Sequence, residues 1–206
     1  HEIRTPLNSI VGFSDLLKDI EAFSPEEVKQ FVDTINTNCT LLLALINDIL
    51  DLSRIESGSM DFRFAGYNLT FVMQQIYDSQ RLSMPCGVDL VMKLPEGESK
   101  SIVTDSVRLK QVINNFINNA KKFTTQGAIT FGYETEDPGY TVFFVEDTGS
   151  GISEENQRRI FERFYKVDSF TQGAGLGLSI CQTIVERFRG EINVYNELGK
   201  GKRLKV

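Results

Sequence analysis

The sequence has few cysteines, no excess of positive charge and no long apolar run, and each shortage excludes a class of protein. Its three cysteines, Cys39, Cys86 and Cys181, are widely spaced, which fits neither a disulfide framework nor a Cys-x-x-Cys metal site. With 28 acidic against 22 basic residues and a net charge of −6, a nucleic-acid surface is not expected. The longest purely apolar run covers only residues 41–46, whereas a bilayer crossing needs roughly 18 residues. We therefore expect a globular protein of a reducing, cytoplasmic compartment, without a membrane span.

The first part of the chain is helical in pattern. Ser24, Pro25 and Glu27 form a capping box with proline at the first helical position, which predicts a helix over residues 25–57. Its apolar seam follows the 4-3-4-3 spacing of a helical-bundle core, through Val28, Val32, Ile35, Cys39, Leu42, Ile46 and Ile49. A preceding helix over residues 1–22 has a matching stripe, formed by Ile3, Leu7, Ile10, Phe13, Leu17 and Ile20.

Two helices with such stripes predict an antiparallel hairpin that pairs with a second copy. One hairpin cannot enclose so much apolar surface, so we expect two chains to form a four-helix bundle. The first helix is about 11 residues shorter than the second, and we expect its remainder to lie upstream of His1 in the intact protein.

After Gly58 the pattern changes to alternating strands and helices, which predicts an α+β domain over residues 61–206. Residues 1–60 then form a separate helical domain. The expected helices cover residues 69–83, 106–123, 154–164 and 176–188. The expected strands cover residues 62–67, 88–94, 128–135, 140–146, 191–196 and 202–206, with a hairpin turn at Asp137, Pro138 and Gly139.

The predicted helix 106–123 carries asparagines on one polar face. Asn115 and Asn119 stand four residues apart and can converge on one ligand, with Lys122 near by. A neutral amide oxygen can hold Mg²⁺ without repelling a triphosphate. Taken alone, the same pattern also fits a solvated polar face.

A second cluster follows an apolar strand, in the run Glu146 to Gly151. Asp147 at the strand end could accept a hydrogen bond from a flat ligand's amine, with glycines that let the ligand approach. The Asp-Thr-Gly-Ser run also occurs in aspartic proteases. That reading needs a second carboxylate in a strand-dominated chain, and this sequence supplies neither. An ordinary turn remains the plain alternative.

Glycines enter the last predicted helix in the run Gly173 to Leu178. Such glycines expose N–H groups at a helix N-terminus, where the helix dipole favours an anion such as phosphate. The spacing is neither GxGxxG nor GxxxxGK[ST], which excludes the dinucleotide and P-loop patterns. A flexible loop is the alternative interpretation.

The only histidine opens the sequence. Thr5 lies four residues after His1 and so shares its helix face, while Pro6 should free the Glu2 carbonyl and bend the helix. A bend beside a nucleophile predicts a hinge. Without context, a lone histidine is an ordinary surface residue.

Together, these segments resemble the sequence boxes of sensor histidine kinases. HEIRTPLNSI is similar to their phosphoacceptor box, NNFINNAKKFT to the N box and EDTGSGI to the first glycine box. IFERFYKVD resembles the F box and GAGLGLSI the second glycine box, in the expected order. The segment FYKVDSFTQG is most similar to the corresponding segment of bacterial hybrid kinases. The resemblance implies a dimerisation and phosphotransfer hairpin, followed by a two-layer α+β sandwich of the Bergerat ATP-binding type.

The resemblance also implies roles for single residues. It makes His1 the phosphorylated nucleophile, Glu2 its acid–base partner and Thr5 the position linked to dephosphorylation of a response regulator. Asn119 becomes the principal Mg²⁺ ligand, and Asp147 reads adenine. The remaining implied ATP-binding residues are Asn115, Lys122, Phe123, Gly149, Gly151, Lys166, Gly173, Gly175, Leu176 and Gly177.

The sequence departs from the family pattern at three places. Ala174 replaces a common threonine, and Lys166 stands where many relatives have arginine, a bidentate donor. The run from Gly199 to Arg203 lacks the usual Ser/Thr-Phe after its glycines. The first two departures are expected to weaken activity without abolishing it.

We therefore predict a homodimeric, ATP-dependent and Mg²⁺-requiring protein-histidine kinase core. It would autophosphorylate His1 and transfer the phosphoryl group to a response-regulator aspartate, in the cytoplasmic portion of a bacterial sensor kinase, membrane-bound or soluble, whose sensor region lies upstream. If Asp147 reads the adenine amine, GTP should be rejected. An ATP-binding scaffold or a phosphatase-dominant sensor is the alternative, and a gyrase- or chaperone-type ATPase would not explain His1 and Thr5.

Overall fold

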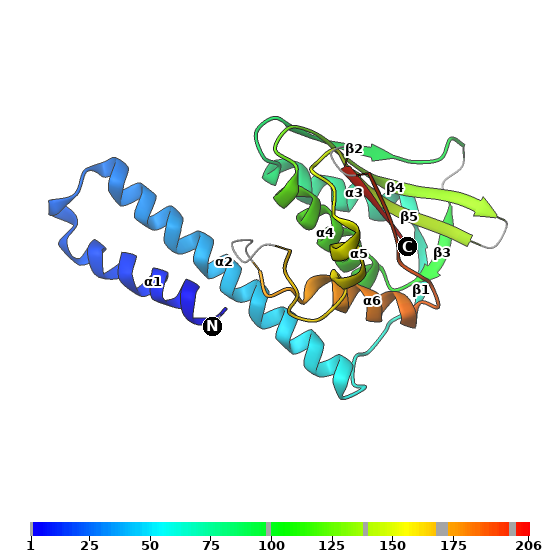
Figure 1. The fold of residues 1–206 in the computed structure, drawn as a ribbon, viewed down its shortest axis with the longest axis horizontal. Helices are drawn as coiled ribbons and strands as arrows, with labels where there is room; N and C mark the ends of the chain where they lie inside the picture. The colour runs from blue at the N-terminus through cyan, green and yellow to red at the C-terminus, as the bar shows by residue number, and fades with distance from the viewer. Residues whose placement is uncertain (1, 98–99, 138–139, 168–172, 198–200) are drawn as a thin grey trace.

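The computed structural model of the chain describes residues 2–97, 100–137, 140–167, 173–197 and 201–206. A helical hairpin projects from a larger α+β domain, and the second half of its longer helix lies against that domain (Figure 1). The expected two-part architecture is confirmed. The hairpin consists of α1 (Arg4–Leu16), the 3-10 helix η1 (Leu17–Ala22) and α2 (Pro25–Glu56).

The turn of the hairpin is fixed by a capping box and by aromatic packing. The Ser24 hydroxyl accepts a hydrogen bond from the Glu27 backbone N–H, and the Glu27 carboxylate accepts one from the Ser24 N–H. The Phe31 ring packs against Phe13 and Phe23, with centroid distances of 5.5 and 5.0 Å. These contacts hold the two helices antiparallel at the closed end.

The first helix differs from the expectation at both of its ends. α1 begins at Arg4, so Pro6 lies in the first turn, where its missing N–H removes no helical hydrogen bond. The bend predicted at Pro6 concerns a helix expected to continue upstream of His1, and it stays a prediction. A break lies instead at Asp19, whose φ of −116° and ψ of 59° interrupt the 3-10 segment.

Helix α2 has two apolar stripes, of which the sequence analysis identified one. The identified stripe faces α1 only in part, so Val32, Ile46 and Ile49 remain more than 40% exposed in a single chain. The second stripe packs on the larger domain and consists of Leu41, Leu45, Leu52 and Ile55. Leu45 is its most deeply buried member.

By length and composition alone, α2 is also apolar enough to cross a membrane. The expectation of no membrane span rested on the short run 41–46, and this 32-residue helix weakens that reasoning. The helix carries Asp48 and Asp51 on the face that packs on the larger domain, and buried charges are costly in hydrocarbon.

The larger domain is built on a five-stranded sheet of order β2-β4-β5-β7-β6, in which only β2 and β4 pair in parallel. Helices α3, α4 and α6 form a second layer over this sheet (Figure 1). The strands are β1 (Ala65–Asn68), β2 (Val88–Lys93), β3 (Ser101–Thr104), β4 (Gly127–Asp137), β5 (Tyr140–Asp147), β6 (Asn193–Glu197) and β7 (Gly201–Lys205). The helices are α3 (Leu69–Gln80), the 3-10 helix η2 (Arg81–Ser83), α4 (Ser106–Phe123), α5 (Glu154–Arg159) and α6 (Gly177–Arg187).

The core lies between the helix layer and the sheet, and α4 is its central helix. The Asp105 carboxylate caps α4 by accepting hydrogen bonds from the N–H groups of Val107 and Arg108. The fully buried side chains include Phe116, Ile117, Phe131, Ile129, Leu176, Ile180 and Ile184. This packing turns the opposite, polar face of α4 toward α2 and the glycine segments.

The sequence predicted most of these elements and erred at three. β3 was missed; it pairs antiparallel with β1 in a separate two-stranded sheet. The expected helix 154–164 ends at Arg159, and Phe164 has a positive φ of 62°. The expected strand 62–67 begins only at Ala65. At the β4–β5 hairpin, Asp137 pairs with Tyr140, and Pro138 and Gly139 lie outside the described residues.

Candidate functional site

A cavity lies between α2 and the larger domain. Its volume is about 850 Å³, within the range of small-molecule and cofactor sites. α4, the glycine segments and β7 line one side, and α2 lines the other, from Asn36 to Asp48. The hairpin therefore contributes a wall that the sequence analysis did not anticipate.

The polar face of α4, which carries the asparagines, lines this cavity. Asn115, Asn119 and Lys122 all contribute, and the Asn119 amide nitrogen donates to the Asn115 amide oxygen over 3.0 Å. This bond uses the nitrogen of Asn119 and leaves its amide oxygen available to a cation. The arrangement suits a hard cation that takes its other ligands from a bound phosphate.

Positive charge gathers at one end of the cavity. Burial lowers the pKa of Lys122, and Lys166 lowers it further, while Asp48 opposes the shift. Two ammonium groups that influence each other in a half-buried site favour an anion between them. Asp48 itself has a raised pKa because of burial and because of the neighbouring Asp51.

The N-terminus of α6 supplies further groups for an anion. The helix begins at Gly177 with no side-chain cap, so its first N–H groups are free of a helical acceptor. A β-carbon built at Gly177 would stand 2.2 Å from the Asn115 amide nitrogen, and one at Gly173 would stand 3.3 Å from the Lys122 ammonium. Glycine at these positions lets the segment close against α4.

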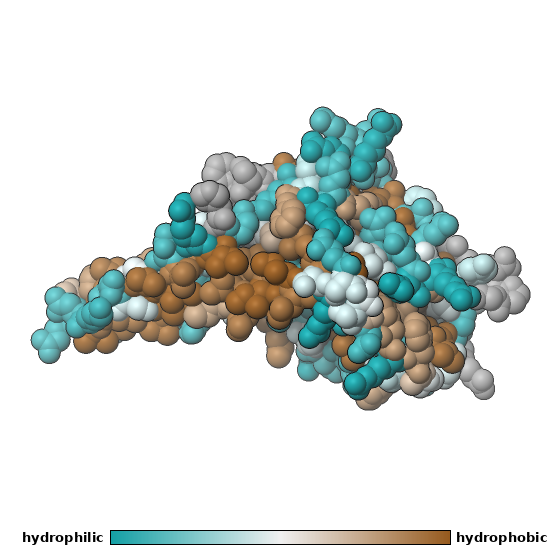
Figure 2. Space-filling view, turned by 90° about the horizontal axis from the view of Figure 1, so that it is seen from below, coloured by the Kyte–Doolittle hydropathy of each residue, from teal (hydrophilic) through white to brown (hydrophobic). Residues whose placement is uncertain are grey.

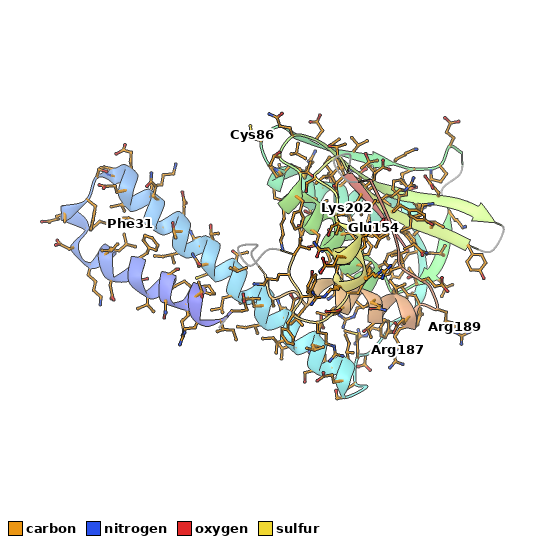
Figure 3. All side chains as sticks on the ribbon, in the orientation of Figure 1. Phe31, Cys86, Glu154, Arg187, Arg189 and Lys202 are labelled. Atoms are coloured by element: carbon orange, nitrogen blue, oxygen red, sulfur yellow. The ribbon has the colours of Figure 1, made fainter. Side chains whose placement is uncertain are left out.

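The Asp147 carboxylate is buried and contacts two neighbouring groups. One carboxylate oxygen accepts a hydrogen bond from the Gly149 N–H at 3.0 Å, and the other lies 2.9 Å from the Lys202 ammonium. The two residues are direct neighbours across β5 and β7. Lys202 lines the cavity, and Asp147 does not. Lys202 lies within the larger domain (Figure 3).

The start of the chain reaches this site. The Glu2 carboxylate forms an ion pair with the Lys166 ammonium at 2.8 Å, and Lys166 lines the cavity. Thr5 is exposed in the first turn of α1, outside the cavity. His1 lies outside the described residues.

Most of the predicted ATP-binding residues line the cavity, and three do not. The cavity is lined by Asn115, Asn119, Lys122, Phe123, Gly151, Lys166, Gly173, Gly175 and Gly177. Asp147 and Gly149 are not among the lining residues, and Leu176 is fully buried in the core. Sequence reasoning missed Asp48 and Lys202. Asp48 stands seven residues after Leu41 and so shares the second stripe of α2, a spacing that could have found it.

Electrostatic contacts fasten the cavity's two walls together. The Asp51 carboxylate accepts hydrogen bonds from the Arg108 guanidinium at 3.3 Å and from the Gln111 amide at 2.7 Å. Nearer the end of α2, Glu56 forms an ion pair with Arg163. The hairpin and the larger domain of one chain are thus joined along the whole second stripe.

Two family profiles match the chain. The profile described as "Histidine kinase-, DNA gyrase B-, and HSP90-like ATPase" matches residues 104–206. The profile described as "His Kinase A (phospho-acceptor) domain" matches residues 1–58.

Curated relatives match nearly the whole chain but are much longer. Autoinducer 2 sensor kinase/phosphatase LuxQ of Vibrio parahaemolyticus is 35% identical, over 98% of this chain and 24% of that protein. Hybrid signal transduction histidine kinase A of Dictyostelium discoideum is 33% identical, over 100% of this chain and 10% of that protein. The chain spans about a quarter or less of the length of these relatives.

Solved structures share the fold over the full chain. Full-length ShkA in complex with AMPPNP has a TM-score of 0.77 at 30% identity, and the match covers 43% of that chain. The histidine kinase ThkA in complex with the response regulator protein TrrA has a TM-score of 0.72 at 27% identity, over 57% of that chain. Both matches cover 100% of this chain.

Proposed function

Because this chain belongs to the sensor histidine kinases, we propose that it transfers the γ-phosphoryl group of ATP to His1 and then to an aspartate of a response regulator. The kinase core is divided here into a phosphotransfer hairpin of residues 1–60 and an ATP-binding domain of residues 61–206. The matches to residues 1–58 and 104–206 support that division.

The ion pair between Glu2 and Lys166 carries the proposal. Glu2 follows His1 by one peptide bond, and Lys166 lines the cavity of the same chain. Neighbouring α-carbons are 3.8 Å apart, so the contact ties the phosphoacceptor segment to the nucleotide pocket. The same contact supports transfer within one chain, because Lys166 pairs with the Glu2 of its own hairpin.

ATP fits the cavity in size and in charge. The triphosphate would lie against Lys122, Lys166 and the free N–H groups at the start of α6. Phosphoryl transfer depends mainly on positioning the γ-phosphoryl group and neutralising its charge. These cations and N–H groups supply both.

Mg²⁺ also fits the donor set. We propose Asn119 as its protein ligand through the amide oxygen, with phosphate oxygens and waters completing the shell. When bound, the ion neutralises phosphate charge. Among the described residues no group of three or more His, Cys, Asp or Glu side chains could hold a metal ion by itself, which suits an ion that binds together with its nucleotide.

In the transfer step, a ring nitrogen of His1 forms the new bond to the γ-phosphorus. The bond from that phosphorus to the bridging oxygen breaks, and ADP leaves with the electron pair. The Glu2 carboxylate accepts a hydrogen bond from the N–H of the other ring nitrogen. This bond fixes the tautomer of the ring and stabilises its positive charge. We assign Thr5 to an opposing activity, the hydrolysis of the phosphorylated response regulator, in which it orients a water toward the phosphoryl group.

The hairpin supports a homodimer. Ile3, Leu7 and Val11 of α1 are 44 to 53% exposed in one chain, and a hydrophobic band runs along the hairpin (Figure 2). A second copy of the hairpin would cover this band as a four-helix bundle. We place the chain in the cytoplasmic portion of a bacterial sensor kinase, with its sensor region upstream and no nucleic-acid partner.

Intact mass spectrometry after incubation with Mg²⁺ and ATP tests the proposed function. The chain, extended upstream of His1 so that α1 is complete, should gain one acid-labile phosphoryl group. His1→Ala should gain none while binding ATP normally. Saturable ATP binding without phosphorylation of the parent protein would instead identify a scaffold or a phosphatase-dominant sensor.

A further inference from the structure

Lys202 is a buried cation on the wall of the nucleotide cavity. Its side chain is 4% exposed, and its ammonium lies 2.9 Å from the Asp147 carboxylate and 5.0 Å from the centroid of the Phe123 ring. Leu204, two residues further along β7, shares its face and also lines the cavity. The strand therefore directs Lys202 inward, into the site.

The Lys202 ammonium has more N–H donors than the protein uses. A lysine ammonium carries three N–H groups and accepts nothing. The Asp147 carboxylate, 2.9 Å away, takes one of them, and among the described residues no acceptor takes the other two. Buried donors without an acceptor are costly, so an acceptor on a bound ligand would satisfy it.

The two classes of purine base, 6-amino and 6-oxo, present opposite groups to such a wall. Adenine offers an amino donor at C6 and an acceptor at N1, whereas guanine and hypoxanthine offer an oxo acceptor at C6 and a donor at N1. A lone carboxylate favours the adenine amine and repels the oxo group. A carboxylate beside an ammonium offers one acceptor and one donor, which complement either base.

Resting on the proposed function, which places a purine nucleotide in this cavity, we propose that Lys202 is a base-reading residue. With Asp147 it lets the site bind 6-oxopurine nucleotides as well as adenine nucleotides. Lys202 donates to N1 of adenine while Asp147 accepts from the amine. For guanine or hypoxanthine, Lys202 donates to the oxo group and Asp147 accepts from N1–H.

A purely structural ion pair makes a different prediction. If Lys202 only neutralises Asp147 within the core, the bound base never meets the ammonium. Selectivity between ADP and GDP would then be the same with or without Lys202. The nucleotide selectivity of the protein therefore separates the two roles, independently of catalytic activity.

Isothermal titration calorimetry with ADP, GDP and IDP in the presence of Mg²⁺ tests the proposal. In the parent chain, GDP and IDP should bind within about 10-fold of ADP. In Lys202→Thr, GDP and IDP should weaken by about 100-fold relative to ADP, because the remaining carboxylate meets an acceptor. Lys205→Thr is the matched control, since Lys205 lies on the same strand, over the Tyr195 ring and outside the cavity.

The parent protein alone can overturn the proposal. ADP binding with GDP more than about 10-fold weaker would refute base reading by Lys202 and leave the kinase assignment intact. If none of the three nucleotides binds, both this proposal and the proposed function fail. Because the decisive ratio is measured on the parent, a Lys202→Thr variant that fails to fold does not remove the test.

Discussion

Asp51 should control whether the ATP-binding domain stays against the hairpin. Its carboxylate is 14% exposed and receives hydrogen bonds from Arg108, itself 15% exposed, and from Gln111. In Asp51→Ala, Arg108 loses its counter-charge inside the interface, although its hydrogen bond to Gln111 remains.

The cost can be estimated from these contacts. Breaking a fully buried ion pair costs about 3–5 kcal/mol, and hydrogen bonds to charged groups contribute about 1.5–3 kcal/mol. Because the pair is partly exposed and Arg108 keeps its contact with Gln111, we expect its loss to cost about 2 kcal/mol. This corresponds to a roughly 30-fold change in the equilibrium between docked and undocked domains. Two other ion pairs between the hairpin and the larger domain, Glu56–Arg163 and Glu2–Lys166, are more exposed and contribute little.

Pulsed electron paramagnetic resonance can measure the docking. Spin labels on Glu26→Cys in the hairpin and on the exposed Cys86 in the larger domain (Figure 3) would report one interdomain distance. All variants would carry Cys39→Ser, so that this cysteine takes no label. Excess unlabelled protein would suppress signals between chains. We expect a narrow distribution in the parent and a broad one in Asp51→Ala. Asp33→Ala, on the exposed face of the same helix, should match the parent. An unchanged distribution in Asp51→Ala would refute the reasoning.

Three further predictions follow from the packing and the charges. Burial raises the pKa of the Cys181 thiol, so a maleimide should label Cys86 in the folded protein and leave Cys181 unmodified until denaturant is added; labelling of both in peptide maps would contradict the packing. Because burial raises the pKa of Asp48 above 3.8, its protonated form stabilises the fold at low pH, and that contribution is lost as the pH rises through the raised pKa. Asp48→Asn should therefore raise the melting temperature at pH 7 and flatten its dependence on pH, and equal melting curves would count against this. Gly177→Ala should weaken ADP binding about 10-fold or more, because its β-carbon would stand 2.2 Å from the Asn115 amide nitrogen; calorimetry showing parental affinity would refute the close approach.

Local pattern predicted the elements that are locally determined. Helix α4 has the predicted ends at Ser106 and Phe123, because Asp105 caps it and its apolar and polar faces alternate at helical spacing. The capping box at Ser24 likewise fixed the start of α2. The strand β3 was missed because its four residues are stabilised by pairing with β1, more than 30 residues earlier, and no short-range pattern records that partner.

Long-range packing also explains why two residues of the site, Asp48 and Lys202, were not predicted from the sequence. A lysine in a short terminal strand suggests a solvent-facing side chain, and only its register opposite Asp147 explains why Lys202 is buried. Asp48 gains its role because α2 packs on a second domain through a stripe beside the one that suggested pairing of hairpins. The glycines and asparagines could be picked out because backbone freedom and helical spacing are properties of the local sequence.

The central claim is that each chain phosphorylates its own His1, and the contact between Glu2 and Lys166 of one chain supports it. Mixed dimers of His1→Ala and Asn119→Ala chains test it most directly, with the parent homodimer as the active control. Transfer within one chain predicts no phosphorylation in the mixed dimer, because each chain lacks either the acceptor or the nucleotide site. Phosphorylation of the Asn119→Ala chain by its partner would contradict the account.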